Sequence, residues 1–200
     1  CGFHAGDPMW MRRTVVLAES HGVAVGAHPS YPDLNGFGRR NLSADPEEVR
    51  NDVVYQASAL SGFTDSKTIQ HVKPHGAMYN QAVADKELGE AICSAVMEVQ
   101  DDAILLALSG SQWVETAKGL GMRVGREIFA DRAVNDDGTL VSRRLPGSVI
   151  HDTEEVVDRS LRMVTEGKVI SVNGNLVEVE ADSICLHGDT PGAVDMAKSL

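Results

Sequence analysis

The sequence has an excess of acidic over basic residues and lacks any long apolar run. Lys and Arg number 18 against 29 Asp and Glu, so the formal net charge is −11. Nucleic acids and anionic membranes bind basic protein surfaces, and neither is expected as a partner. No apolar run approaches the roughly 18 residues of a membrane span, and no signal peptide is visible. A small molecule or another protein is left as the partner, in the cytoplasm.

Cysteines are also few, and two common catalytic motifs are missing. The three cysteines are widely separated and form neither a disulfide framework nor a zinc-ribbon pattern. We expect Cys93 and Cys185 to be buried, reduced core residues. The sequence contains neither the Gly-x-x-x-x-Gly-Lys-Ser/Thr phosphate loop nor the Gly-x-Ser-x-Gly nucleophile motif. If the activity consumes ATP, we expect the nucleotide to bind elsewhere.

Short apolar runs that predict strands alternate with longer segments that predict helices, which indicates an α/β fold with a parallel sheet. The predicted strands are 23–27, 68–73, 103–108, 122–129 and 183–186, and the predicted helices are 8–20, 45–60, 85–99, 112–118, 153–166 and a last one from about 191. Asn173-Gly174 predicts a β-hairpin with a type I′ turn, as a surface decoration over 169–179. The 200 residues are predicted to form a single domain, smaller than the roughly 250 residues of a full eightfold barrel.

Five histidines follow predicted strand ends. They are His4, His28, His71, His75 and His187. Loops at the carboxyl ends of parallel strands converge on one face, so we expect these imidazoles to line one barrel mouth. The structural alternative is a set of buried histidines that tie loops together by hydrogen bonds. His21 and His151 lie near helix boundaries and are expected to face solvent.

A metal site stays open as an alternative. His71 and His75 have the spacing of a helical metal pair, but Pro74 between them breaks the helical geometry. His4 and His28 could instead bind a divalent metal together with a carboxylate from an upstream segment. The sequence does not identify the metal.

Lys73 and four carboxylates are the other chemical candidates. Lys73 either forms an ion pair with Glu127 or Asp131, or binds an anionic substrate group and polarises a carbonyl. Asp7, Glu127, Asp131 and Asp189 are candidate general bases, although Asp189 is equally placed to cap the last helix.

Taken in order, the motifs closely resemble the LamB/YcsF family over nearly all of the chain. They cover residues 1–7, 26–33, 36–40, 71–80, 127–132 and 185–189. The resemblance implies a distorted, seven-stranded β/α barrel related to the glycoside hydrolase/deacetylase group. It also implies ATP-dependent opening of the lactam of 5-oxo-L-proline to L-glutamate, together with subunits B and C of a 5-oxoprolinase, which would handle ATP.

The chain departs from the family pattern in two places. Family members begin with a strand that carries an Asp-Leu-Asn-x-Asp-x-Gly-Glu type motif, so we expect the first strand to lie upstream of Cys1 and the last helix to be cut short at Leu200. Ala133-Val134 stands where the family usually has a Tyr after Ala-Asp-Arg.

These observations lead to a hypothesis of lactam hydrolysis with the following roles. Lys73 and Arg132 would hold the substrate carboxylate or an activating phosphate, His71 and His75 would polarise the amide or move protons, and Asp7, Glu127 or Asp131 would activate water. His4, His28, His187 and Asp189 would complete the substrate site. The alternatives are a metal-dependent deacetylase or carbohydrate-modifying hydrolase on the same barrel, and a non-catalytic subunit that binds the ATP-using partners.

Overall fold

The computed structural model describes residues 1–200, which divide into two compact units, 1–107 with 115–124 and 108–114 with 125–200. The fold is α/β. The helices are α1 (Pro8–Ser20), α2 (Pro46–Ser61), α3 (Gly76–Ala84), α4 (Lys86–Val99), α5 (Gln112–Gly119), α6 (Thr153–Thr165) and α7 (Ala193–Ser199). The strands are β1 (Gly26–Ala27), β2 (His71–Val72), β3 (Ile104–Leu108), β4 (Arg123–Phe129), β5 (Lys168–Ile170), β6 (Leu176–Glu178) and β7 (Ser183–Cys185).

Strands β1 to β3 form parallel ladders in the first unit, and the strand order of the five-stranded sheet is β1-β2-β3-β4-β7. Gly26 pairs with His71, and His71 pairs with Ile104. The ladders of β1 and β2 are only two residues long, shorter than the predicted 23–27 and 68–73. Pro29 and Pro74, close behind the two strands, lack the backbone N–H that a longer ladder would need. The seven-stranded barrel stays a prediction.

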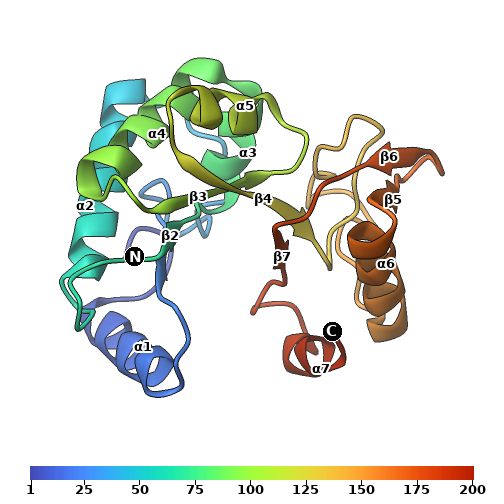
Figure 1. Cartoon of the computed structure of the whole chain (residues 1–200), viewed down its shortest axis with the longest axis horizontal. Helices are drawn as coiled ribbons and strands as arrows, with labels where there is room; N and C mark the ends of the chain where they lie inside the picture. The colour runs from blue at the N-terminus through green and yellow to red at the C-terminus, as the bar shows by residue number, and fades with distance from the viewer. The chain divides into compact units, whose positions relative to one another are not determined.

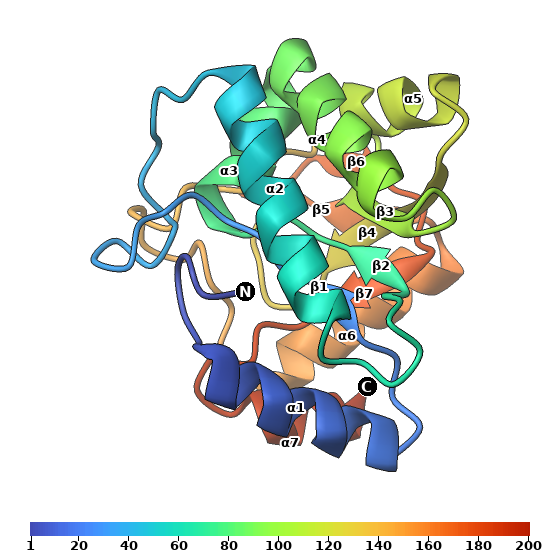
Figure 2. The ribbon, with the colours of Figure 1, turned by 90° about the vertical axis from the view of Figure 1, so that its left-hand side faces the viewer.

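Helix α2 shows how the sequence builds the outer layer of the first unit. Asp45 and Glu48 form a capping box around Pro46, which fixes the amino-terminal end of the helix. Its buried face carries Val49, Val53, Ala57 and Leu60 at helical spacing. This face makes α2 pack beside α4, as Figure 2 shows.

The second unit contains the parallel pair β4–β7 and the antiparallel pair β5–β6. Helix α6 lies against β5 (Figure 1). Its Met163 joins Ile128, Val134 and Val169 in a buried apolar cluster. The predicted type I′ turn is wrong. Such a turn needs positive φ at two central residues, whereas Gly174 has φ 84° and Asn173 is not among the residues with positive φ.

Helix α3 is the main element that the sequence analysis missed. In the sequence, Pro74 and Gly76 indicate only the end of a strand, yet a helix begins directly at Gly76 and buries Ala77, Met78 and Tyr79. The helix has no side-chain cap, so the usual start signal is absent. The predicted helices 8–20, 45–60, 85–99, 112–118 and 153–166 are confirmed within a few residues.

Smaller findings concern the cysteines and the membrane. None of the three cysteines forms a disulfide; Cys93 is buried as predicted, but Cys185 is only half-buried. No helix of the structure combines the length and the apolar character that crossing a membrane requires.

Candidate functional site

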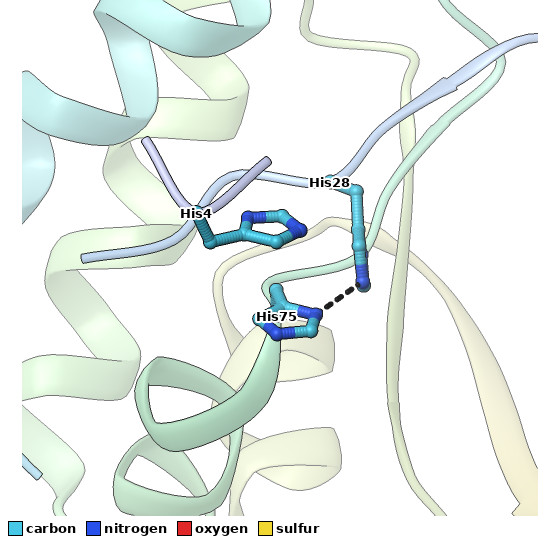
Figure 3. Close-up of side chains that lie close together, drawn as sticks. All are labelled: His4, His28 and His75. Atoms are coloured by element: carbon cyan, nitrogen blue, oxygen red, sulfur yellow. Dashed lines mark hydrogen bonds between the residues drawn. The ribbon is translucent and has the colours of Figure 1, made fainter. Parts of the chain in front are cut away.

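Three of the five predicted strand-end histidines meet in the first unit (Figure 3). His4 lies in the loop before α1, His28 directly follows β1, and His75 lies between β2 and α3. One ring nitrogen of each histidine lies within 4.8 Å of those of the other two. His28 Nε2 and His75 Nδ1 are 2.9 Å apart, and the rings of His4 and His75 stack with their centroids 3.8 Å apart. We call these residues the histidine cluster.

The outer ring nitrogen of each imidazole is held by an oxygen of a neighbouring loop. His4 Nδ1 lies 2.8 Å from the hydroxyl of Ser30, and His75 Nε2 donates to the Phe37 carbonyl oxygen at 2.8 Å. His28 Nδ1 donates to the carbonyl oxygen of Lys73. These bonds orient the rings, so the cluster is held by one side-chain hydroxyl and two backbone carbonyls.

Buried polar residues support these loops. The Gln56 side chain accepts from the Ser30 N–H at 3.0 Å and donates to the Ser30 carbonyl at 2.9 Å. Asp33 accepts from the Gly36 N–H at 2.9 Å and pairs with Arg40. Arg40 of the Gly-Phe-Gly-Arg-Arg motif therefore holds the loop that carries the Phe37 carbonyl.

Burial favours the neutral forms of His4 and His28. It lowers the pKa of His4 to about 3 and that of His28 well below its ordinary value, and His75 adds a repulsive charge interaction to both. The ammonium of Lys73 also lowers the pKa of His28, and after burial it is the second cause of the lowered pKa of His71. Lys73 is therefore electrostatically coupled to two imidazoles, and the neutral rings have lone pairs available.

His71 does not join the histidine cluster. Its ring packs against the backbone of Gly26, where an added Cβ would come within 2.1 Å of His71 Nε2. Its Nδ1 lies 3.1 Å from the side-chain oxygen of Gln70. Gly26 thus makes room for the imidazole of the neighbouring strand.

The second unit has a cluster of its own around Asp131, whose side chain is fully buried. The carboxylate accepts hydrogen bonds from His187 Nδ1 at 2.8 Å and from the Thr190 hydroxyl at 2.7 Å. Burial alone would raise the pKa of Asp131, but the hydrogen bonds from His187 and Thr190 outweigh it and hold the pKa below its ordinary value. That this cluster and the histidine cluster line one mouth stays a prediction.

The structure gives some other candidates structural roles. Asp7 is exposed and caps α1 by accepting from the Trp10 N–H at 2.8 Å. Arg132 is buried and donates to the backbone carbonyls of Ser148 and Val141. The predicted roles of Asp7 in activating water and of Arg132 in holding the substrate stay predictions.

Glu127 and Asp189 are the remaining two candidates. Glu127 is buried in β4. The alternative role of Asp189 as a helix cap is wrong, because Gly192 is the N-cap of α7. The general-base roles of both carboxylates stay predictions.

Sequence reasoning missed Ser30, Gln56 and Thr190. Ser30 and Thr190 form hydrogen bonds to His4 and Asp131, and Gln56 holds the backbone of Ser30, each across at least 26 residues of sequence. Ser30 lies two residues after His28, and Thr190 directly follows the Cys-Leu-His-Gly-Asp motif, so both could have been flagged by proximity. For Gln56, the only signal is that a polar side chain stands in the middle of a predicted apolar helix face.

Asparagine at Asp131 is expected to lower the free energy of unfolding near neutral pH by about 2 kcal/mol, because a charged hydrogen-bond acceptor is replaced by a neutral one in a buried site. A carboxylate with a depressed folded-state pKa stabilises the fold above its unfolded-state pKa of about 3.9, and loses that effect as the pH falls through the folded-state value. The difference between wild type and Asp131→Asn should therefore shrink below about pH 4 in urea denaturation. Asp195→Asn, in an exposed pair with Lys198, is the control. A difference of the same size at pH values of about 3 and about 7 would contradict the assignment.

Known proteins resemble this chain over its whole length. The model of the LamB/YcsF family matches residues 1–200. The A subunit of 5-oxoprolinase from Campylobacter jejuni subsp. jejuni (strain 81-176) is 51% identical over 202 residues, which cover 100% of this chain and 79% of that protein. The A subunit of 5-oxoprolinase from Thermococcus onnurineus (strain NA1) is 52% identical over 198 residues, which cover 98% of this chain and 78% of that protein. The crystal structure of the lactam utilization protein from Thermus thermophilus superimposes with a TM-score of 0.91 at 47% identity, covering 100% of this chain and 80% of that one. The chain therefore belongs to the LamB/YcsF family.

Proposed function

We propose that this protein is the lactam-opening subunit of an ATP-dependent 5-oxoprolinase and produces L-glutamate together with subunits B and C. The observation that carries the proposal is identity of about half of all residues, over essentially the whole chain, with proteins named as the A subunit of 5-oxoprolinase. The half-buried imidazoles of His28 and His71, on which the charge of Lys73 acts, are the kind of groups that such a reaction needs.

In this reaction, water adds to the lactam carbonyl carbon and the ring C–N bond breaks. The nitrogen takes up a proton and becomes the amino group of glutamate. An unstrained amide is a poor electrophile with a poor leaving group, so ATP hydrolysis through a phosphorylated intermediate is a reasonable source of activation. The sequence has no phosphate loop, so we assign ATP to the partner subunits.

Lys73 is the residue of this chain that we place at the lactam. It directly follows β2, it is half-buried, and its charge acts on His28 and His71. An ammonium in this position would stabilise negative charge that develops on the carbonyl oxygen or on an activating phosphate. The neutral imidazole of His71, beside it, would move a proton to or from the reacting groups.

The test is glutamate formation from 5-oxoproline and ATP by the full-length protein, alone and mixed with candidate B and C subunits. We expect glutamate only in the complete mixture, with ATP consumed in step. Glutamate formation by the protein alone and without ATP would favour a stand-alone hydrolase instead. No glutamate in any mixture of folded components would refute the proposal.

A further inference from the structure

We propose that His4 Nε2, His28 Nε2 and His75 Nδ1 together bind one divalent transition-metal ion of the Zn²⁺ class. The inference goes beyond lactam opening and does not depend on it. It rests on the hydrogen bonds that place the proton of each ring and on the spacing of the rings.

The contact between His28 and His75 requires a cation. A carbonyl oxygen can only accept, so His28 donates its Nδ1–H to Lys73 and His75 donates its Nε2–H to Phe37. The proton of each neutral ring is thereby placed on the outer nitrogen. The two inner nitrogens, His28 Nε2 and His75 Nδ1, then face each other at 2.9 Å with a lone pair each. Two acceptors at this distance repel each other unless a proton or a metal ion lies at the contact.

The same reasoning applies to His4 through Ser30. The Ser30 hydroxyl donates to the Tyr31 carbonyl at 3.0 Å, so it accepts from His4 Nδ1–H at 2.8 Å. His4 Nε2 therefore also has a free lone pair, on the side of the ring that points toward His28 (Figure 3). Metal-binding histidines in proteins almost always donate their other ring N–H to an acceptor of this kind, and all three rings here do.

A metal ion fits this cluster better than a bridging proton. A shared proton would make one ring of the His28–His75 pair an imidazolium and would leave His4 Nε2 without a role in the contact. Neutral imidazole, by contrast, is the form that ligates metals. The three nitrogen–metal bonds offset the cost of burying the charge of the ion. A shared proton, in contrast, bonds to only two nitrogens.

The spacing and the ligand type indicate which ion fits. Zn²⁺–nitrogen bonds of about 2.0–2.1 Å in tetrahedral geometry place the nitrogens roughly 3.3 Å apart. The separations here, 2.9 Å for His28–His75 and up to 4.8 Å within the cluster, bracket this value. The ring of His4 stacks in parallel on that of His75, so it would turn out of this stack to aim its Nε2 at the ion. Imidazole suits Zn²⁺, Co²⁺ and Ni²⁺, whereas Mg²⁺ and Ca²⁺ prefer oxygen ligands. Three protein ligands leave a coordination position open, where such an ion could polarise a carbonyl or a water.

The experiment measures metal binding by full-length protein that has been stripped with a chelator. Zn²⁺ binding is followed by calorimetry, Co²⁺ binding by its visible absorption, and the bound metal is counted by elemental analysis. We expect one ion per chain, and no displacement by millimolar Mg²⁺. His28→Ala should weaken binding by more than about 100-fold, and Ser30→Ala, which only removes the acceptor of His4, should weaken it by about 10- to 100-fold.

His71→Ala is the matched control, because it removes a half-buried imidazole from the neighbouring strand without touching the cluster. Wild-type affinity in this variant, together with losses in His28→Ala and Ser30→Ala, supports the site. Circular dichroism identifies variants that do not fold, and Ser30→Ala keeps the test valid if His28→Ala is among them. A folded, stripped protein that binds no ion, or a folded His28→Ala and Ser30→Ala pair with wild-type affinity, would overturn the proposal. Because binding is read without substrate, it is independent of the glutamate assay.

Discussion

Methionine at Lys73 is expected to lower glutamate formation by the complete three-subunit mixture by about 100- to 1,000-fold, the usual cost of removing one donor that stabilises developing charge. Methionine keeps most of the aliphatic stem of lysine and removes only the ammonium. The measurement is kcat/KM for 5-oxoproline with saturating ATP and partner subunits, in the full-length protein.

The backbone around Lys73 should be unaffected by this substitution. Its N–H donates to the Ala27 carbonyl at 2.9 Å, and its carbonyl accepts from His28, and neither bond involves the side chain. A loss of activity can therefore be assigned to the missing charge. Unfolding in urea should show wild-type stability to within about 1 kcal/mol.

Lys86→Met is the matched control for the Lys73 variant. Lys86 lies at the start of α4, its side chain is 71% exposed, and it pairs only with Glu90 one turn away. Such a pair contributes about 0.3–0.5 kcal/mol at most, so activity should be unchanged. Wild-type activity in both variants would remove Lys73 from the reaction and would leave the imidazoles as the groups to test.

The order of the elements could be predicted because each one has a local signal. Strand β4 ends in the buried apolar pair Ile128 and Phe129, and α2 has a capping box and an apolar stripe. The start of α3 could not be predicted in this way. It begins at a glycine with φ 57° and without a side-chain cap, and it is held by the Ala77 N–H bond to the distant Gly38 carbonyl.

The candidate site could be predicted as a set of strand-end histidines, but not as a particular cluster. His71 and His75 both follow the same strand signal, and only the tertiary structure decides between them: His71 packs on Gly26, and His75 turns to His28 and Phe37. The deciding contacts are backbone carbonyls. A carbonyl is present at every residue, so sequence alone carries no signal for which one a histidine will find.

Alanine at Gly76 is expected to lower the free energy of unfolding by about 3 kcal/mol, roughly 1 for the left-handed backbone and roughly 2 for overpacking. Gly76 has φ 57°, and an added Cβ would lie 2.5 Å from the Gly38 carbonyl oxygen and 3.1 Å from its carbon. Both contacts are with backbone, which cannot rotate away as a flexible side chain can. The Gly38 segment must therefore move away from α3.

Gly22→Ala separates the two contributions to this loss. Gly22 has φ 65°, close to that of Gly76, but nothing lies within 4 Å of an added Cβ. It should therefore lose only the backbone contribution of about 1 kcal/mol. Equal losses in the two variants, measured by urea denaturation, would show that the close approach of Gly38 to Gly76 does not constrain the fold.

The larger consequence of Gly76→Ala is expected at the histidine cluster. The Gly38 carbonyl accepts the Ala77 N–H at 2.9 Å, and the adjacent Phe37 carbonyl accepts from His75 Nε2 at 2.8 Å. Moving this segment outward lengthens both bonds and frees the His75 ring to rotate, so its Nδ1 no longer faces His28 in a fixed position. Gly76→Ala should therefore weaken Zn²⁺ binding by about 10- to 100-fold, as loss of an outer hydrogen bond to a metal-binding histidine does, while Gly22→Ala keeps wild-type affinity. Since both variants have strained backbones, a difference in affinity between them arises from the position of the Phe37 carbonyl, and equal affinities would show that this carbonyl does not orient His75.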